Sequence, residues 1–564
     1  MTATSTDADR TRLHELGYAQ ELNRKMGWFS NFAISFSIIS ILAGGTTTYY
    51  LAGFAGGPRM ITLGWLIVGF FVLLVGMSMA EIVSVYPTAG GLYYWSAKLA
   101  RKNGAMWSWF TGWFNLLGQI GVIASVDYAL ALFTGYLIKL YDDSFTLTPK
   151  TVFVIFAIML ALHGFINSRG VTLVKILGDI SVWWHVGGVA IIFGVLLVAP
   201  DNREGFGFIL DFNNGTGWTN NGNGSHIPGI YASLIGLLLA QYTITGFDAS
   251  AHVSEETTDS GRSASVAIVR AIYVSAIAAL ILNVAMLQAT PKGAFNDIIL
   301  GADGFLVLGG ANALAVPLGG SGAKLLIAIC VVAQFFCGMA SVTANSRMIY
   351  AFSRDGAIPG HRIWHKINPK TRTPTNSIWL GCGLSLLVGA LSLYQANDYS
   401  VAFFAMTGMC VVGLYIAYAI PIYLRLRNPD FVQGEWNLGK WSKLVGWTSV
   451  VWVGFISILF FAPPFWPFWP PGSSTVFGAG TVDEFTVYHL SNFNFTPVII
   501  IGFFIAVGVW WMVSAKHWFK GPQIQGTPEE LRAIEIALET GDVETFRKLE
   551  DEEDERVTEH QEGH

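Results

Sequence analysis

Charge is scarce in this sequence. Only 13% of its 564 residues are charged, while 52% are hydrophobic and 14% are aromatic. Soluble globular chains carry about 25% charged residues, so the composition excludes a purely soluble protein. Several apolar stretches run for about 20 residues, a length that crosses a bilayer core of roughly 30 Å. The sequence therefore predicts an all-α integral membrane protein with many spans.

Cysteine is scarce as well. The four cysteines, Cys330, Cys337, Cys382 and Cys410, all fall inside apolar runs. We expect them to be small packing residues of helices, and we expect neither a disulfide framework nor a metal site. The first 26 residues also lack the apolar segment of a secretory signal, so a cytosolic N-terminal tail is expected there.

Motifs of several protein classes are missing. The sequence contains no Gly-x-x-x-x-Gly-Lys-Ser/Thr loop for nucleotide phosphates, so ATP drive within this chain is not expected. The 11 histidines are scattered, without the dense His, Glu and Asp spacing of a metal site. We therefore expect no enzyme activity, no cofactor, no metal and no nucleic-acid partner. The oligomeric state is left open.

Twelve apolar stretches are candidate membrane spans. An even number places both termini on one side. With the N-terminus in the cytosol, 27 of the 33 basic residues fall on the cytosolic side, as the positive-inside rule requires. We therefore expect a multi-pass protein of the cell membrane with both termini in the cytosol. The stretches cover residues 28–51, 61–85, 107–138, 151–167, 181–199, 229–250, 264–287, 323–349, 376–394, 401–424, 445–463 and 497–515.

The C-terminal region differs from the rest in charge. Residues 521–564 carry 14 acidic and 4 basic residues. Thr527, Pro528 and Glu530 predict a capped helix start, so one or two short amphipathic helices are expected in an otherwise solvated tail.

Two predicted spans contain helix-breaking residues near their middle. The first reads "SILAGGTTTYY" and the sixth reads "TITGFDASAH". Glycine and threonine are poor helix formers, and two such spans five helices apart are typical of transporters built from inverted repeats. Freed backbone N–H and C=O groups at the breaks would bind the carboxylate and the ammonium of a zwitterion. The alternative is that the glycines only permit close helix packing.

Four motifs in order resemble the amino acid–polyamine–organocation permeases, and most of all their GABA, choline and amino acid permease subgroup. They are "MAEIVSVYPTAGGLYYW" at 79–95, "INSRGVTLVKI" at 166–176, "GFDASAHVSEET" at 246–257 and "ANSRMIYAFSRDGAIP" at 344–359. The resemblance implies the leucine-transporter fold of two inverted five-helix repeats with two additional helices. The implied boundaries are a tail at 1–26, repeats at 27–200 and 201–430, additional helices at 431–515, and an acidic tail at 516–564.

The resemblance and the breaks together point to a substrate site and its coupling groups. Asp248 could act in coupling or could simply cap a half-helix. His185 stands where proton-coupled relatives place a lysine, so it could carry or replace the coupling cation, or it could be a satisfied packing residue. Gln119 could bond substrate or a neighbouring helix, and Phe247 could gate the site or pack. The predicted substrate-binding residues are Ser40, Ala43, Gly44, Gly45, Thr46, Gln119, Thr245, Gly246, Phe247 and Asp248.

Charged residues near the cytosolic ends of helices two, six and eight predict an intracellular gate of ion pairs, although plain surface pairing would leave the same pattern. They are Glu81, Glu255, Glu256, Arg347 and Arg354.

The resulting hypothesis is a secondary transporter that imports a small amino acid or amine, such as a GABA-like compound, a neutral amino acid or choline. Proton symport is expected, and sodium coupling is not excluded. For choline, an aromatic cage from Trp113, Trp183, Trp184 and Tyr242 is conceivable. The alternatives are an antiporter or polyamine permease of the same fold, and a membrane nutrient sensor without flux.

Overall fold

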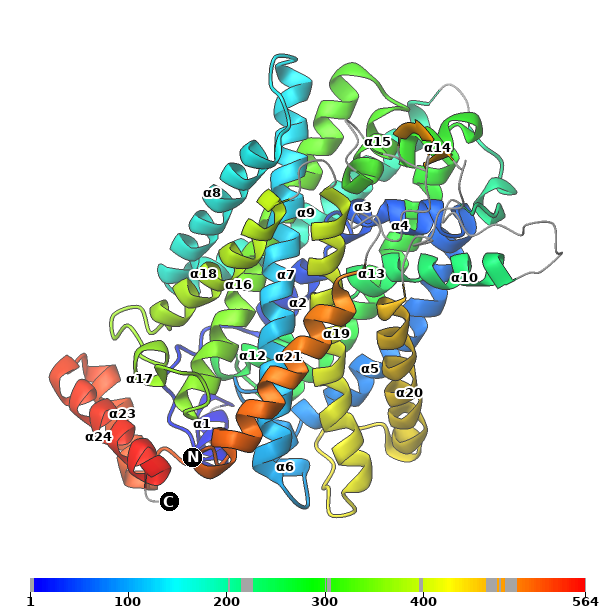
Figure 1. Cartoon of the computed structure of the whole chain (residues 1–564). Coiled ribbons are helices and arrows are strands. Elements are labelled where there is room, and N and C mark those ends of the chain that lie inside the picture. The colour runs from blue at the N-terminus through cyan, green and yellow to red at the C-terminus, as the bar shows by residue number, and fades with distance from the viewer. Residues whose placement is uncertain are drawn as a thin grey trace.

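A bundle of long helices makes up most of the molecule (Figure 1). The computed structural model describes residues 5–200, 203–214, 227–299, 301, 306–394, 399–462, 474–475, 478–481 and 494–562. Within these residues, ten helical stretches are long and apolar enough to cross a membrane. They are η1 with α5 (Met60–Gly64, Trp65–Val83), α7 (Gly104–Tyr141), α8 (Pro149–Ser168), α9 (Val171–Val198), α13 (Ser260–Ala289), α16 (Gly320–Arg354), α18 (Thr375–Ala390) with η6 (Leu391–Tyr394), α19 (Tyr399–Arg427), η7 (Gly439–Trp441) with α20 (Ser442–Phe461), and α21 (Thr496–Trp510) with η9 (Trp511–Ala515) and α22 (Lys516–Trp518).

Two further predicted spans are split into short helices, as their sequences predict. The first becomes α2 (Trp28–Ile38), α3 (Gly44–Thr47) and α4 (Tyr49–Phe54). The sixth becomes α10 (Ile227–Gly236), α11 (Leu238–Thr243), α12 (Ala249–His252) and the turn η3 (Ser254–Glu256). The prediction that both spans are interrupted is therefore confirmed.

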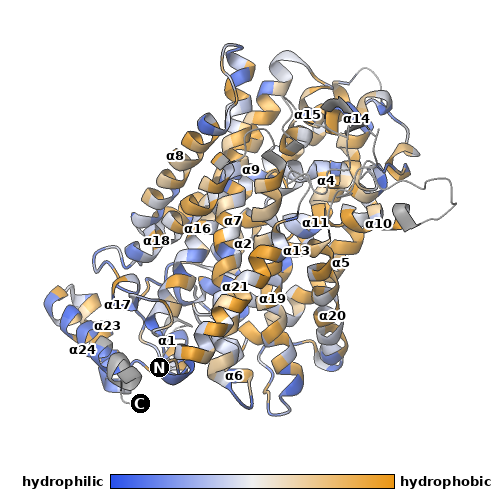
Figure 2. Cartoon of the chain, in the orientation of Figure 1, coloured by the Kyte–Doolittle hydropathy of each residue, from blue (hydrophilic) through white to orange (hydrophobic). Residues whose placement is uncertain are grey.

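The side chains sort between the bundle interior and its surface. Helix α7 runs through the middle, packs against α16 and α19, and is almost wholly buried. Large apolar side chains such as Phe70, Trp183 and Ile458 are exposed on the outer helices, and Figure 2 shows these faces as predominantly hydrophobic. Exposed apolar surface of this extent matches lipid as the surrounding solvent.

The two ends of the bundle carry different short elements. We call the end that carries both termini the inner end (Figure 1). It holds α1 (Ser5–Leu16), α6 (Leu92–Leu99), α17 (His361–Trp364), α23 (Pro528–Thr540) and α24 (Val543–Glu562). The opposite, outer end holds α4, η2 (Phe208–Leu210), η4 (Lys292–Ala294), α14 (Phe295–Ile299), η5 (Leu306–Leu308), α15 (Gly309–Ala315) and, among the described residues, the short hairpin of β1 (Ser474–Thr475) and β2 (Gly478–Thr481).

The acidic C-terminal region is docked and is not a freely solvated tail. The capping box predicted at Thr527 and Glu530 is present at the start of α23. Helix α23 buries Leu531, Ile534 and Leu538 in a small apolar cluster that includes Ala19. The expectation of a solvated tail is wrong because the amphipathic face of α23 covers the N-terminal segment of residues 5–26.

Candidate functional site

The interruption of the first predicted span lies slightly upstream of its expected position. Helix α2 ends at Ile38, and a turn in which the Ser40 carbonyl accepts from Ala43 N–H and Gly44 N–H leads into α3. Gly44 and Gly45 therefore begin a short helix and do not form the unwound stretch. A Cβ on Gly44 would lie 2.9 Å from Thr243 Cα, so this glycine permits contact between the two interrupted helices.

The interruption of the sixth predicted span occurs where Gly246 predicts it. Helix α11 ends at Thr243 and α12 begins at Ala249. Gly246 has a φ of +86°, and a Cβ there would lie 2.4 Å from Ile38 Cγ2. Only glycine tolerates both the left-handed backbone and this approach, so Gly246 fixes the break against the end of α2.

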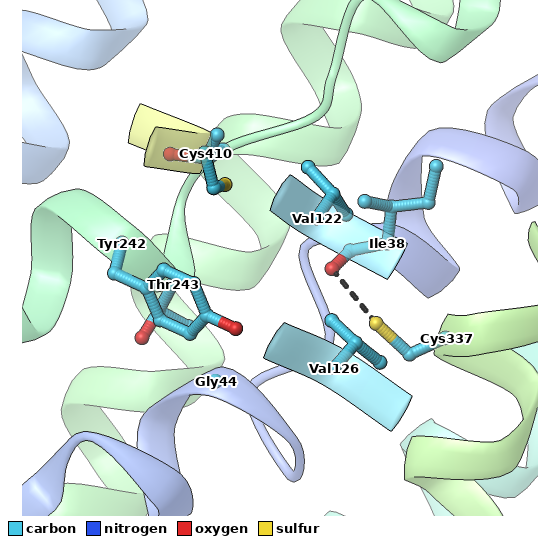
Figure 3. Close-up of a pocket in the computed structure, with 9 residues that line it drawn as sticks. Ile38, Gly44, Val122, Val126, Tyr242, Thr243, Cys337 and Cys410 are labelled. Atoms are coloured by element: carbon cyan, nitrogen blue, oxygen red, sulfur yellow. Dashed lines mark hydrogen bonds between the residues drawn. The ribbon is translucent and has the colours of Figure 1, made fainter. Parts of the chain in front are cut away.

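A small cavity lies between the two interruptions (Figure 3). Its volume is about 20 Å³, which is enough for one water molecule and too small for an amino acid. The site is therefore closed in this conformation. Of the predicted binding residues, Gly44 and Thr245 line the cavity. The full lining is Ile38, Gly44, Val122, Val126, Tyr242, Thr243, Thr245, Cys337 and Cys410.

Two cysteines line this cavity, which sequence reasoning missed. Cys337 Sγ donates to the carbonyl of Ile38, an acceptor at the interruption, at 3.3 Å. Cys410 lies in α19, whose backbone approaches α7 so closely that a Cβ on Gly121 would lie 2.7 Å from Cys410 N. All four cysteines are free and buried, as predicted. The only sequence signal for the two in the cavity is the row of small residues around them.

His185 contacts the first interruption. Its Nε2 lies 2.6 Å from Ser40 Oγ, and its Nδ1 lies 2.8 Å from the Ser181 carbonyl oxygen. Since a carbonyl oxygen only accepts, Nδ1 donates to Ser181, and Nε2 can accept from the Ser40 hydroxyl. The same hydroxyl oxygen accepts from Ala43 N–H. His185 thus ties α9 to the turn before α3.

Asp248 is the centre of a second buried polar group. Gln119 Nε2 donates to its Oδ2 at 2.9 Å, and Tyr418 donates to its Oδ1 at 2.6 Å. Asp248 stands at the N-cap position of α12, yet its carboxylate makes no capping hydrogen bond. The capping alternative is therefore wrong, and Gln119 bonds this carboxylate. The neighbouring Phe247 is buried and packs on the Tyr418 ring at 5.0 Å.

The remaining predicted binding residues surround the cavity without being part of its lining. Ser40 and Ala43 belong to the turn after α2, and Gly45 and Thr46 belong to α3. Thr46 donates to the carbonyl of Leu42 at 2.8 Å.

Four of the five predicted gate residues form buried ion pairs at the inner end. Arg347 contacts both carboxylate oxygens of Glu256, at 2.9 and 3.2 Å. Arg354 lies 3.3 Å from Glu255. All four side chains are almost completely buried, so the surface-pairing alternative is wrong.

Glu81, the fifth predicted gate residue, lies apart from these pairs. Its carboxylate binds Arg425 of α19 and accepts from the Ser442 hydroxyl and from Leu438 N–H. It therefore fastens α5 to α19 and α20. The sequence places Glu81 near the inner ends of the helices but does not reveal which arginine it meets.

The N-terminal segment covers the buried ion pairs. Tyr18 and Tyr93 both donate to Asp355, at 3.1 and 2.7 Å, and the Arg354 guanidinium lies 3.7 Å from the centre of the Tyr18 ring. Burial raises the pKa of Asp355 to about 6, although Arg354 and these donors oppose that rise. Tyr350 in turn donates to Glu21 at 2.7 Å.

Helix α23 and the residues before it hold the N-terminal segment in place. Gln525 accepts from Ala19 N–H and donates to Glu21, both at 2.7 Å. Glu535, almost fully buried, accepts from Gln20 N–H at 3.0 Å and lies 2.6 Å from His14 Nε2. The sequence does not predict these contacts, since they join residues more than 500 positions apart.

A further buried pair joins α7 to α8. Asp127 of α7 and His163 of α8 are both fully buried, with His163 Nδ1 3.1 Å from Asp127 Oδ2. A Cβ on Gly338 would lie 2.0 Å from Asp127 Oδ1, so α16 passes directly beside the pair. This contact stabilises the α7–α8–α16 packing.

The aromatic cage considered for choline is not assembled. Trp183 and Trp184 are exposed on the outside of α9, and Trp113 packs against Trp109 and Trp510. Of the four proposed aromatic residues, only Tyr242 belongs to the cavity lining. Hydrophobicity alone did not distinguish lipid-facing tryptophans from interior ones.

Similarity to known proteins agrees with this geometry. The family model described as "Amino acid permease" matches residues 26–504. The chain is 40% identical to "Amino-acid permease BAT1 homolog" of Oryza sativa subsp. japonica, over 92% of this chain and 96% of that protein. It is 29% identical to "GABA-specific permease" of Saccharomyces cerevisiae (91% and 86% covered) and 27% identical to "Putative polyamine transporter" of Candida albicans (95% and 93% covered). With its interrupted helices, buried polar centre and full-length match, the chain belongs to the amino acid permease family.

Proposed function

We propose that this permease imports a small amino acid or amine across the cell membrane by proton symport with alternating access. The observation that carries the proposal is the closed cavity between two interrupted helices, with backbone groups and Asp248 beside it. Interrupted helices at bilayer depth are tolerated where their free backbone groups meet a solute or water.

The proposed architecture has twelve spans, namely the ten long stretches and the two interrupted ones. Residues 27–200 and 201–430 form two inverted five-helix repeats, and residues 431–515 add two helices. We place the inner end in the cytosol because the basic residues of the sequence gather on that side. Both the N-terminal segment and the acidic C-terminal helices then lie in the cytosol.

The cavity lining favours a small zwitterion over a polyamine. All nine lining residues are uncharged, whereas a polyamine with several ammonium groups needs carboxylates to compensate it. A zwitterion needs only N–H groups for its carboxylate and carbonyl oxygens for its ammonium. GABA and neutral amino acids satisfy this requirement, and the missing aromatic cage argues against choline.

The candidates for coupling are the two predicted residues beside the interruptions, His185 and Asp248, and at least one of them is proposed to take part. Each connects an interrupted span to a neighbouring long helix: His185 of α9 bonds Ser40, and Asp248 bonds Gln119 of α7. A proton arriving at either group changes a buried charge at the site, which is the physical requirement for driving a conformational change.

Purified protein in liposomes tests the proposal. An inward proton gradient should concentrate labelled GABA or alanine inside the vesicles, and a protonophore should abolish the accumulation. Accumulation that instead depends on a second internal solute identifies an antiporter, and uptake of labelled spermidine identifies a polyamine permease. Binding of GABA or alanine without any flux contradicts the proposal and supports the sensor alternative.

A further inference from the structure

His252 and Asp248 form a contact that the predicted coupling set does not include. They lie four positions apart across α12, and His252 Nε2 is 3.3 Å from Asp248 Oδ2. Both side chains are fully buried. His252 Nε2 makes no hydrogen bond of good geometry, although it faces a carboxylate oxygen.

The other ring nitrogen fixes the position of one proton. His252 Nδ1 lies 2.8 Å from the carbonyl oxygen of Ala89. A carbonyl only accepts, so Nδ1 carries a hydrogen and donates it. In the neutral ring, Nε2 therefore directs a lone pair at Oδ2. Two lone pairs at this distance repel each other, and one additional proton, on Nε2 or on Oδ2, removes the repulsion and makes the pair neutral as a whole.

His185 differs from His252 in this respect. Its Nδ1 donates to the Ser181 carbonyl, and its Nε2 accepts from the Ser40 hydroxyl. Both ring nitrogens are satisfied in the neutral ring, so no additional proton is required there. The geometry thus distinguishes His185, which the sequence predicts as a coupling residue, from His252, which it does not.

We propose that the single proton shared by Asp248 and His252 is the proton that drives transport, with His252 as the second coupling residue. The inference rests on the proposed function of proton symport. When this proton passes to water at the inner end, Asp248 keeps a negative charge and His252 becomes neutral, with no other bond made or broken. The repulsion that results separates the Asp248 carboxylate from the His252 ring and so distorts α12, the short helix between them. A proton that arrives from the outer side restores the contact.

The Ala89 backbone connects this pair to the inner ion pairs. Its carbonyl accepts from His252 at 2.8 Å, and its N–H donates to Glu255 Oε1 at 2.9 Å. Glu255 Oε1 is also the atom that meets Arg354 at 3.3 Å. A displacement of His252 therefore reaches the acceptor of the Arg354 pair through the backbone of a single residue, Ala89.

The groups that surround the pair are compatible with a single exchangeable proton. Helix α2 contributes neutral side chains that bond Ser250, and α13 contributes buried serine, alanine and isoleucine side chains. On the inner side, the charges of η3 are compensated by arginines of α16. The neighbouring elements contribute the following titratable or charged groups around the Asp248–His252 pair: Cys410, Tyr415 and Tyr418 of α19, Glu255 and Glu256 of η3, and Arg347 and Arg354 of α16. Helix α7 contributes the neutral amide of Gln119.

The test compares His252→Asn with the wild type in liposomes. The amide nitrogen of asparagine can take the place of Nδ1 and keep the Ala89 hydrogen bond, while Nε2 is lost. Two quantities are measured with labelled GABA and alanine: exchange without a pH gradient, and accumulation driven by an inward proton gradient, with proton entry followed by an internal dye. We expect the ratio of driven accumulation to exchange to fall at least tenfold, about 1.4 kcal/mol of lost coupling.

His163→Asn is the control for asparagine in place of a buried histidine, since its amide nitrogen can replace Nδ1 and keep the contact with Asp127; it should keep the wild-type ratio. His252→Gln repeats the test if the asparagine variant does not fold. Full proton-driven accumulation in either folded His252 variant overturns the proposal, as does loss of coupling in His185→Asn with coupling retained in His252→Asn. Wild-type liposomes without any flux contradict the proposed function itself, so the two failures are distinguishable.

Discussion

The inner and outer ends of the bundle are closed by different interactions. At the inner end, the ion pairs of Arg347 and Arg354 are buried under Tyr18 of the N-terminal segment. At the outer end, glycines permit close approach: a Cβ on Gly310 would lie 2.1 Å from the Thr46 carbonyl oxygen, and one on Gly53 would lie 2.7 Å from Cδ1 of the Ile299 side chain.

Under the proposed function, this difference predicts two kinds of gate. Separating buried charges exposes groups that need water or a partner, so we expect the inner end to respond to charge and to protons. Separating small residues and apolar side chains requires only that other packing replace the lost contacts, so we expect the outer end to respond to the size of the solute that enters. An importer needs the outer end to admit solute and the inner end to stay closed until the solute is bound.

The largest expected effect comes from Arg347→Met, which leaves Glu256 buried without its partner. Losing one member of a buried pair destabilises a structure by about 3–5 kcal/mol, and here that loss falls on the inner closure. Accumulation should collapse, and a cysteine placed at the inner end should react faster with a thiol reagent. The double variant Arg347→Met/Glu256→Gln should recover part of the loss, and equal reactivity in wild type and Arg347→Met would contradict the gate.

A smaller effect is expected at the outer end from Gly310→Ala. The added methyl group collides with the Thr46 carbonyl, and overpacking of this kind destabilises by about 1–3 kcal/mol. Uptake should fall on the order of tenfold, with the outer end held open. Gly293→Ala is the control, because nothing lies within 4 Å of the added atom. Equal uptake by the two variants would show that this contact does not close the outer end.

The pH dependence of the inner closure is predicted from Asp355. Its pKa is raised from 3.8 to about 6 by burial, so its contribution is fully present below pH 3.8 and is lost as pH rises through about 6. The melting temperature of the wild type should therefore fall between pH 3.8 and about pH 6 relative to that of Asp355→Asn, and run parallel to it above that range. Melting temperatures that also run parallel within that range would assign the pH dependence to other groups.

The smallest effect at the inner end is expected from Lys366→Gln. Lys366 lies 3.3 Å from Asp551, but both side chains are partly exposed, and such pairs contribute about 0–1 kcal/mol. The melting temperature should hardly change, and transport should stay within twofold of the wild type, about 0.4 kcal/mol. A loss as large as that of Arg347→Met would show that exposed pairs, too, close this end.

Much of the helix arrangement could be predicted from local sequence. Apolar length defines the long helices, Gly246 defines one break, and Thr527 with Glu530 defines a cap, because each of these properties acts over a few residues. The break near Gly44 was misplaced since a glycine pair permits either unwinding or close packing, and only the neighbouring Thr243 decides between them.

The candidate site was harder to predict because its contacts join distant segments. The sequence marks Gln119 and Asp248 separately and does not predict their hydrogen bond. It groups Glu81 with the wrong arginines, since position along a helix does not say which neighbour a side chain faces. It does not predict the contact of His252 with Asp248, which gains its significance from the hydrogen bond between His252 and the carbonyl of Ala89.

The interlock between the two ends of the chain also bears on how the protein is made. The segment around Ala19 is synthesised before the predicted membrane spans, but Gln525 and Glu535, which hold it, are synthesised after them. The inner closure is therefore completed only once translation reaches α23. Both ends of the described chain lie at the inner end (Figure 1), so the position of a reporter domain becomes an experimental variable.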